Sequence, residues 1–474
     1  MSNQLSLMQS YTWFGHFNYA KGSDWFPGRL RYSPESGVQL DYFMTLNFDV
    51  PSTTVLFGVL DDGKLCTLYG NFDPSAGGMQ IGGASLWKGT RGFNFCLIGE
   101  HILEEHSFVG LDLDFNNLQE FCFPKSMHEQ IPYSDKPLLD TDCGEVRVQV
   151  VNHGQFDFTS AGLVSELYSD NKALLADLES AIGEAIGKHP DSALFKRKTI
   201  GWYLRLLREE GATARRWMEH LYSIELLLSL LLFKPVFPIE MQLRAQDEEG
   251  KIRSYGVLGG IAGLNNQTIP KLTRNDIHET LAIRLQTIDL GAVIKCWPEV
   301  KEGFELFASK IKGDSGTRSK HQCQAEYVLL LAQLESVAQK AGLDHNKRYE
   351  EAIAAFGAAA LVALILKILD VAAIAKVGQV LSRLRSEIAH FSKSRKRLDK
   401  IGLRHLVALN RCLDLVIAAS LYKELGIADA VIAEFQVQHV QSLNHYLAPV
   451  PLFNIVRKKH QEPDAGQAEE DSGA

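Results

Sequence analysis

The stretch Thr54–Tyr69, TVLFGVLDDGKLCTLY, decides the first part of the fold. Two short apolar segments, Thr54–Leu60 and Leu65–Tyr69, flank the polar tetrapeptide Asp61-Asp62-Gly63-Lys64. Apolar runs rich in β-branched and aromatic residues on both sides of a turn that contains Asp and Gly are typical of a β-hairpin. The stretch therefore predicts β structure at this point of the chain.

The same pattern extends through the remainder of the N-terminal region. Short apolar or aromatic runs alternate with glycine, aspartate and proline turns, and they predict strands at Phe93–Ile98, Phe108–Leu113, Leu118–Phe123 and Val146–Val151. Short strands at such regular spacing are typical of a sandwich or a half-open barrel. We therefore expect a β-rich N-terminal region over residues 1–155.

The periodicity changes after residue 155, where apolar residues recur at helical spacing. The elements expected in this middle region are helices at Ala173–Gly187, Leu194–Glu210, Thr213–Phe233, Ile277–Val293 and Val300–Ile311, with a hairpin-like pair at Ile239–Arg244 and Ile252–Val257. Pro235 and Pro238 end the third of these helices. Residues 156–311 are thus predicted to be an α+β region that packs with the β region before it.

Residues 312–319 contain no apolar side chain and are the predicted linker to a second domain. After this linker the chain is predicted to be entirely helical, with helices near 320–341, 347–369, 372–391, 402–425 and 427–446. Short polar joints between helices imply antiparallel neighbours. We expect an all-α bundle over residues 320–455 and a disordered, charged tail over residues 456–474.

Length and composition agree with a multidomain globular protein. The chain has 474 residues, 46% of them hydrophobic and 22% charged. That is too long for one ordinary core and has average soluble composition. The formal net charge of −8 excludes a protein covered in positive potential, so that any contact with nucleic acid must come from a local basic cluster.

The cysteines and the N-terminus indicate the compartment. The seven cysteines are scattered, and none form a Cys-x-x-Cys pair, so that neither a zinc site nor a disulfide framework is expected. Residues 1–10 lack the charged and apolar segments of a signal peptide. We therefore expect a cytoplasmic protein without a metal or a cofactor.

One apolar run tests this expectation. Ala352–Leu366 carries no charge, but a membrane span needs roughly 18 to 20 such residues. Because the run is shorter, we expect a buried core helix and no contact with a membrane. The alternative is a helix that is buried in a membrane or between subunits.

The segment Leu384-Arg385-Ser386-Glu387-Ile388-Ala389-His390 is the candidate active site. Histidine exchanges protons near neutral pH, and arginine offers a fixed, permanently charged set of donors to phosphate oxygens. The two residue types together suit cleavage of RNA without a metal. Four basic residues follow the segment, at Lys393, Arg395, Lys396 and Arg397.

The spacing of arginine and histidine is a weak signal by itself. Arg215 and His220 have the same spacing, but no basic run follows them. Five residues of a regular helix give roughly 140° of rotation and about 7.5 Å of rise, so that the side chains of Arg385 and His390 would not meet on one phosphate. Either the helix bends or ends near His390, or two copies of the segment meet across a dimer.

This segment resembles the signature of HEPN domains, which is an arginine, a small polar residue and a histidine four to six positions after the arginine. The commonest residue after the arginine in that signature is asparagine, and here it is Ser386. Tyr327–Ala338 resembles the opening helix of the ApeA-like HEPN branch, and its acidic position falls on Glu335.

The N-terminal part is similar to the ApeA N-terminal domain. The likeness rests on Trp25–Leu30 with Gly37–Leu40, on the leucine-rich helix that ends in Lys234-Pro235-Val236, and on Trp297 ahead of Phe304. The resemblance implies a bacterial anti-phage ribonuclease that acts by abortive infection as a homodimer or higher oligomer, without a metal. Its N-terminal region would sense a phage-derived trigger or restrain the nuclease.

The resemblance also implies roles for the site residues. His390 would be the acid and base, and Arg385 the phosphate stabiliser, with Ser386 assisting. Glu335 would orient Arg385 or His390. Lys393, Arg395, Lys396 and Arg397 would hold the RNA, which could be tRNA or another cellular RNA, and cleavage through the 2′-hydroxyl would leave a cyclic phosphate.

Two other functions stay open. The helical part could be a non-catalytic HEPN-like module for dimerisation or nucleotide binding, joined to a ligand-binding β domain. The β region could instead bind carbohydrate through Trp13, Trp25 and Trp87, although burial in a core is the commoner use of such residues.

Overall fold

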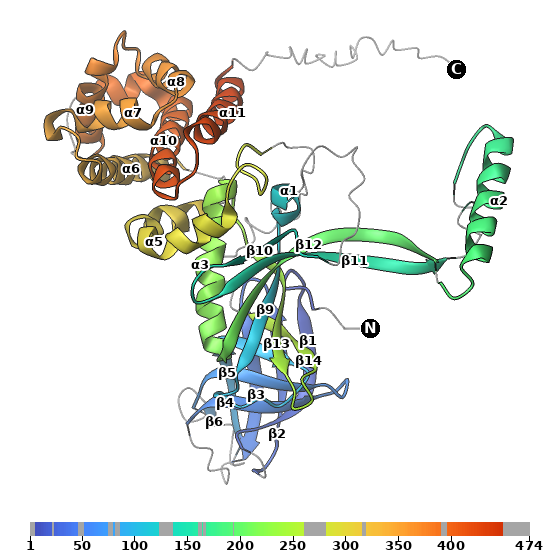
Figure 1. Cartoon of the computed structure of the whole chain (residues 1–474). Coiled ribbons are helices and arrows are strands. Elements are labelled where there is room, and N and C mark those ends of the chain that lie inside the picture. The colour runs from blue at the N-terminus through green and yellow to red at the C-terminus, as the bar shows by residue number, and fades with distance from the viewer. Residues whose placement is uncertain are drawn as a thin grey trace, which may run out of the picture.

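The computed structural model describes residues 5–20, 23–45, 52–73, 79–80, 86–122, 136–159, 164, 167–192, 194–259, 281–314, 319–389 and 396–448 (Figure 1). Within these residues the N-terminal part is built on an antiparallel β sheet and the C-terminal part is helical, as the sequence predicts. The predicted disordered tail lies outside the described residues.

The sheet contains fourteen described strands, in the order β10-β11-β12-β9-β13-β14-β8-β5-β4-β1-β2-β3-β7-β6. Burial alternates along its strands because successive side chains point to opposite faces; in β2, Phe26, Leu30 and Tyr32 are buried, whereas Arg29 and Arg31 point outward. The strands are β1 (Tyr11–Asn18), β2 (Phe26–Ser33), β3 (Gly37–Thr45), β4 (Thr53–Leu60), β5 (Leu65–Phe72), β6 (Met79–Gln80), β7 (Leu86–Phe93), β8 (Phe95–Ile98), β9 (Phe108–Phe115), β10 (Leu139–Asp142), β11 (Arg147–Thr159), β12 (Leu194–Ala212), β13 (Pro238–Gln246) and β14 (Ile252–Gly259).

Several predicted strands are confirmed. β4 and β5 form the hairpin around Asp61-Asp62-Gly63-Lys64, and Gly63 adopts the positive φ of 79° that the turn requires. The pair β13 and β14 is the second predicted hairpin. β8, β9 and β11 correspond to the predicted strands at Phe93–Ile98, Phe108–Leu113 and Val146–Val151.

Two predictions were wrong in type. Leu118–Phe123, expected to be a strand, contains the short helix α1 (Leu118–Cys122), which buries Leu118, Phe121 and Cys122 after the turn at Asn117. Leu194–Glu210, expected to be a helix, is the strand β12. Pairing with β11 and β9 prevails over the helix propensity of its leucine, arginine and glutamate residues.

The described helices are α1, α2 (Lys172–Lys188), α3 (Ala214–Leu232), α5 (Leu290–Lys312), α6 (Lys320–Lys340), α7 (Arg348–Phe356), α8 (Ala359–Leu369), α9 (Val377–Ala389), α10 (Lys396–Glu424) and α11 (Asp429–Leu447), with 3-10 turns η2 (His345–Lys347) and η3 (Ile374–Lys376). α2 and α3 confirm two predicted helices, and the Thr213 side chain caps α3.

Three helix predictions need correction. The described residues of Ile277–Val293 are not helical before Leu290, where the Asp289 side chain caps α5, and the predicted helix Val300–Ile311 is the second half of α5. The predicted helix at 347–369 is broken at Gly357 into α7 and α8. The predicted helix at 402–425 is confirmed, since Gly402, whose φ is 69°, is the kink after which α10 continues to Glu424.

One hydrophobic cluster of the described residues runs through both parts of the molecule. Trp297 of α5 donates to the Ser223 carbonyl of α3 at 3.0 Å, and Phe233 packs edge-on against Phe435 of α11 at a ring distance of 5.3 Å. The Tyr422 hydroxyl of α10 donates to the Leu230 carbonyl of α3. α3 and α5 therefore join the sheet to the helical part (Figure 1).

Among the described residues, α10 is the one helix long and apolar enough to cross a membrane. In its most apolar window, 83% of the residues are buried inside the molecule. This burial is typical of a core helix. The shorter run at Ala352–Leu366 is divided between α7 and α8, and Leu361, Leu364 and Ile365 are buried there, as expected for a core segment.

Two strands and a helix project from this body as an arm (Figure 1). Near the body, Leu204–Leu207 of β12 pairs with β9. Further out, His153–Thr159 of β11 pairs with Leu194–Gly201 of β12 and with no other described strand. Helix α2 lies at the far end of this arm.

Candidate nuclease centre

Residues 384–389 of the candidate segment form the last turns of α9, and their side chains differ in exposure. Leu384 is buried in the bundle, the side chain of Arg385 is 35% exposed, and Ser386 is exposed. Leu384 thus anchors the helix to the core, and the next two residues present polar groups at its surface.

Arg385 is held by residues of two other helices. Its Nη1 donates to Glu335 Oε1 of α6 at 2.7 Å and to the Tyr349 hydroxyl of α7 at 3.3 Å. The Tyr349 hydroxyl also donates to Glu335 Oε1, and Arg348 Nη2 lies 3.0 Å from the same oxygen. The structure thus brings Glu335 and Arg385 together, as the resemblance implies, and it adds Tyr349 and Arg348.

The pKa shifts of this cluster keep its groups charged. Burial acts to raise the pKa of Glu335, but the Tyr349 hydrogen bond and the charges of Arg348 and Arg385 outweigh it, so that the pKa is lowered. The hydrogen bond with Tyr349 and the charge of Glu335 raise the pKa of Arg385. Two arginines share one carboxylate, and the cluster therefore carries a net positive charge that suits a phosphate.

Glu387 has a structural position. Its carboxylate accepts hydrogen bonds from the backbone N–H of Arg397 at 3.0 Å and of Leu398 at 2.9 Å, in the first turn of α10. A carboxylate at a helix N-terminus accepts hydrogen bonds from free N–H groups and is attracted by the positive end of the helix dipole. Glu387 therefore fixes the start of α10 beside the end of α9.

The remaining predicted site residues are described in part. His390, Lys393 and Arg395 lie outside the described residues. Lys396 is exposed and Arg397 partly exposed in the first turn of α10. Because Glu387 joins Arg397 to α9, these two cations lie near the end of the helix that carries Arg385.

Sequence reasoning missed Tyr349 and Arg348. Both stand at the start of a predicted helix, and no spacing relates them to Arg385. The sequence does contain a chemical signal for them, because Arg348 and Tyr349 are adjacent. Together they offer a cation and a hydroxyl to the Glu335 carboxylate of the preceding helix.

The second Arg–His pair of the chain is arranged differently. His220 of α3 packs at 5.7 Å from the Trp217 ring, and burial, followed by the charge of Arg216, lowers the pKa of His220. Arg215 is exposed on the first turn of the same helix. Glu145 lies 3.0 Å from Arg216 and 3.9 Å from His220, so that the carboxylate beside this pair contacts Arg216 and not Arg215.

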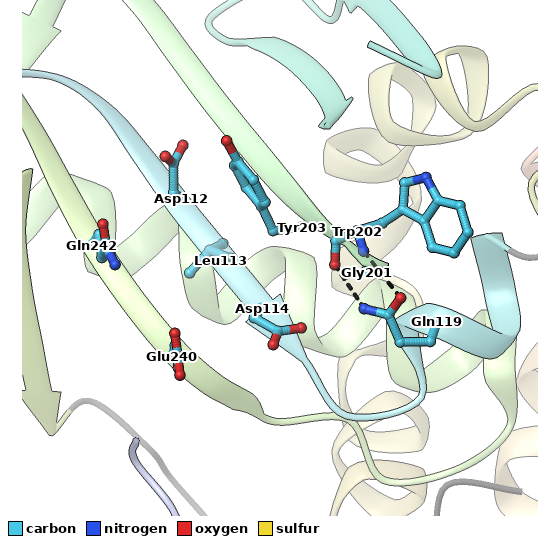
Figure 2. A pocket seen from close by; sticks show the side chains of 9 residues that line it. All are labelled: Asp112, Leu113, Asp114, Gln119, Gly201, Trp202, Tyr203, Glu240 and Gln242. Carbon is cyan, nitrogen blue, oxygen red and sulfur yellow. Dashed lines mark hydrogen bonds between the residues drawn. The ribbon is translucent and has the colours of Figure 1, made fainter. Parts of the chain in front are cut away.

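A second candidate site is a small pocket in the sheet, where β12 separates from β9 (Figure 2). Its volume is about 170 Å³. It is lined by Asp112, Leu113, Asp114, Gln119, Gly201, Trp202, Tyr203, Glu240 and Gln242. Gln119 of α1 closes one end, because its side chain bonds the Trp202 carbonyl at 2.9 Å and the Trp202 N–H at 3.0 Å.

The carboxylates of this pocket differ in their partners. Asp112 accepts from Arg205 at 2.8 Å and from Arg244 at 3.0 Å. Asp114 and Glu240 are cross-strand partners, and neither forms a salt bridge with another described residue. Burial, followed by the neighbouring charge of Glu240, raises the pKa of Asp114 to about 7.

The described residues contain no group of three or more His, Cys, Asp or Glu side chains arranged to hold a metal ion. Of the tryptophans considered for carbohydrate binding, Trp13 is buried and stacks on Tyr11 at 5.3 Å, whereas Trp25 is 42% exposed. The side chain of Trp87 lies outside the described part. The Trp25 ring lies 6.2 Å from the His101 ring.

The chain matches the model of a known protein family. The model of a protein family described as ApeA N-terminal domain 1 matches residues 12–297, more than half of the chain. No curated protein and no solved structure matches. The matched range covers the sheet, the arm, α3 and the first turns of α5, and the helical part from α6 onward lies beyond it.

Proposed function

The chain belongs to the ApeA N-terminal domain 1 family, whose context is anti-phage defence, and we propose that its helical part is a metal-independent HEPN endoribonuclease. It would act in the cytoplasm by abortive infection, cutting cellular RNA such as tRNA. The observation that carries this proposal is the position of Arg385, which Glu335 and Tyr349 hold beside the exposed Ser386, five residues before His390.

The proposed reaction is a transesterification within the RNA backbone. His390 takes the proton of the 2′-hydroxyl, the 2′-oxygen forms a bond with phosphorus, and the bond from phosphorus to the 5′-oxygen breaks. The proton then passes to the leaving 5′-oxygen, so that the products are a 2′,3′-cyclic phosphate and a 5′-hydroxyl. Arg385 stabilises the charge that develops on the phosphate oxygens, and Ser386 donates a further hydrogen bond.

The basic residues after the segment are assigned to the RNA backbone. Lys396 and Arg397 project near the start of α10, and Lys393 and Arg395 precede them in the sequence. Each cation that binds a phosphate adds affinity that falls with salt. Because the net charge of the chain is −8, this local run supplies the attraction that the whole molecule lacks.

The N-terminal region is proposed to sense a phage-derived trigger or to restrain the nuclease. α5 gives this role a physical route, because Lys312 at its end pairs with Glu225 of α3, and Lys310 pairs with Glu326 of α6 at 2.8 Å. A change in the sheet would reach the helix that carries Glu335. The helical part is expected to act as a homodimer or higher oligomer.

Purified full-length protein incubated with total cellular RNA tests the proposal. Wild-type protein should cut RNA with or without EDTA and leave cyclic phosphate ends, and Arg385→Ala or His390→Ala should each abolish cleavage and phage protection. Arg215→Ala and His220→Ala are the matched controls and should leave both intact. Loss of cleavage in EDTA would contradict the metal-free mechanism, and unchanged cleavage by His390→Ala would remove the nuclease assignment.

The pocket lined by Asp114 and Glu240 favours a second candidate function, in which the chain is a ligand-binding module with a non-catalytic helical part. This alternative predicts that His390→Ala retains phage protection, whereas Asp114→Asn with Glu240→Gln loses it. The nuclease proposal predicts loss of protection with His390→Ala.

A further inference from the structure

Helix α2 carries an apolar stripe that no other described part of the molecule covers. Leu174, Leu178, Ile182 and Ile186 follow one another at intervals of four residues, so that they share one face of the helix. No residue of α2 is buried, and Leu174 and Leu178 are 47% and 38% exposed. The stripe therefore stands in solvent in a single copy of the chain.

The arm holds α2 away from the body. The outer part of the arm, in which His153–Thr159 pairs with Leu194–Gly201, is roughly 20 Å long at about 3.3 Å per residue. Figure 1 shows α2 at the tip of this arm, on the opposite side of the molecule from α5 and α6. An apolar helix held out in this way is a feature of surfaces that bind a partner.

The same chain has an apolar groove between α5 and α6 that no other described element fills. Leu306 of α5 is 80% exposed and Leu329 of α6 is 65% exposed, and Ala325 and Ala332 lie beside Leu329 in the groove lining. The groove has a volume of about 780 Å³, enough to receive several branched aliphatic side chains. Its polar lining has three charged residues, Lys310, Asp314 and Glu326, of which Lys310 and Glu326 form an ion pair at 2.8 Å. The other polar lining residues are Ser309, Gln322, Gln333 and Ser336.

We propose that α2 of one copy lies in the α5–α6 groove of a second copy, and that two copies exchange their arms about a two-fold axis. An amphipathic helix with apolar residues at i, i+4 and i+8 is the shape that an apolar groove accepts. One contact of a helix about 25 Å long is small for a stable interface, which begins at roughly 1,200 Å². Reciprocal exchange makes the contact twice and closes the assembly.

The charges of α2 argue against two other partners. The helix carries Lys172 and Lys188 against Asp177, Glu179 and Glu184, so that its net charge is negative and an anionic membrane would repel it. Antiparallel pairing of two α2 helices with their stripes in register would place the two Glu179 side chains close together, which is unfavourable. In the groove the charged lining residues are already paired, Lys310 with Glu326 and Asp314 with Arg411, so that no unpaired anion of the lining opposes the helix.

The mass of the full-length protein in solution tests the exchange. Wild-type protein should sediment as a dimer or a multiple of it, and Leu178→Glu in α2 or Leu329→Glu in the groove should each halve that mass. Ser180→Glu, on the opposite face of α2, is the matched control and should leave the mass unchanged. All three positions are exposed, so that circular dichroism should stay that of the wild type.

Disulfide cross-linking identifies the contact itself. Mixing Leu178→Cys protein with Leu329→Cys protein under oxidation should give a covalent mixed dimer, against a low background because five native cysteines are buried and two are half-buried. A cross-link in Leu178→Cys alone, without the mixed product, would show that α2 pairs with itself and would overturn the proposal.

Two further results would also overturn it. One is a wild-type monomer at all concentrations tested. The other is binding to anionic lipid vesicles that Leu178→Glu abolishes, which would assign α2 to a membrane surface. None of these measurements depends on nuclease activity, because each detects association and none detects RNA cleavage.

Discussion

The position of the Arg385 guanidinium depends on the Tyr349 hydroxyl as well as on the Glu335 carboxylate. Glu335 Oε1 is shared by Arg385, Arg348 and Tyr349, so that no single ion pair fixes the guanidinium of Arg385. Tyr349 is buried and its ring is locked in the bundle, which makes its hydroxyl a rigid support for a partly exposed cation. Such a support fixes the direction of the Arg385 guanidinium without using all of its N–H donors.

Removing that hydroxyl should lower cleavage while leaving the fold intact. For Tyr349→Phe we expect the rate constant of RNA cleavage to fall about 10-fold or more, because a hydrogen bond to a charged group contributes roughly 1.5–3 kcal/mol. Single-turnover kinetics at saturating protein measures the effect. Tyr327→Phe, which loses a buried bond to the Leu381 carbonyl, is the control and should cost stability but not cleavage. Equal rates for Tyr349→Phe and wild type would contradict the supporting role.

The acidic pocket of the sheet should make stability depend on pH. Burial and Glu240 raise the pKa of Asp114 from 3.8 to about 7, so that the stabilisation from its protonated form is complete below pH about 4 and is lost as the pH rises through 7. Asp114→Asn should remove this loss and raise the free energy of unfolding at pH 8 relative to wild type by about 1 kcal/mol or more. Urea unfolding at pH 5 and pH 8 gives the comparison.

Asp140→Asn is the opposite control. The Arg147 hydrogen bond lowers the pKa of Asp140, whose stabilisation is present above its ordinary pKa and is lost as the pH falls through the lowered value. Asp140→Asn should therefore slightly destabilise the protein at pH 8. An Asp114→Asn variant less stable than wild type at pH 8 would show that Asp114 is ionised and paired there.

The sequence identifies some of these residues and not others. Arg385 and Glu335 follow from a resemblance between short segments, and the structure brings them into contact. Tyr349 and Asp114 escape, because their importance comes from neighbours that are distant in sequence. Asp114 meets Glu240 only after β9 and β13 pair, which no local pattern reveals.

At the level of elements, prediction succeeds where periodicity and turn residues agree. β4 and β5, α3 and the pair β13 and β14 all have both signals. It fails in β12, where Trp202, Leu204 and Leu206 alternate in burial with Tyr203 and Arg205 inside a sequence of good helix formers. Two neighbouring strands decide the conformation there.

The break between α7 and α8 has a cause that is equally distant in sequence. Gln436 of α11 is buried, and its Nε2 donates to the carbonyls of Phe356 at 2.8 Å and Leu415 at 3.0 Å. Its Oε1 accepts from the Ala358 N–H. One side chain thus satisfies the backbone groups that the broken helix leaves free, and a local reading of residues 347–369 has no access to it.

Replacing this glutamine should destabilise the whole bundle. For Gln436→Leu we expect a loss of about 1–3 kcal/mol in the free energy of unfolding, because buried backbone groups lose their partners. Chemical denaturation measures it. Gln379→Leu, on the exposed face of α9, is the matched control and should change stability by less than about 0.5 kcal/mol. Similar losses for both variants would contradict this account of the break.

At the scale of the whole molecule, a buried ion pair fixes α5 against α3 just before the chain enters the helical part. Lys312, at the end of α5, contacts Glu225 of α3, and their side chains are 5% and 0% exposed. Burial raises the pKa of Glu225 to about 7 against the opposing effect of Lys312. Lys312 is also the first residue of the predicted linker. The start of that linker is therefore held against α3.

Replacing only Lys312 should destabilise the protein more than replacing both Lys312 and Glu225. Lys312→Met leaves a buried carboxylate and should lower the free energy of unfolding by about 3–5 kcal/mol, whereas the double variant Glu225→Leu with Lys312→Met should recover most of that loss. Denaturant unfolding at pH 8 tests both. Lys400→Met, in an exposed pair with Asp370, is the control and should cost less than about 1 kcal/mol. A double variant as unstable as Lys312→Met would contradict this reading.

Helix α5 also limits how this protein could have been assembled from parts. The family match ends at residue 297, inside a continuous helix that runs to Lys312. One residue inserted after Trp297 would turn Phe304, Phe307 and Ile311 by about 100° around the helix axis, away from the surfaces that they now fill. A different C-terminal part can therefore be grafted onto this domain only if it continues α5 in the same rotational phase.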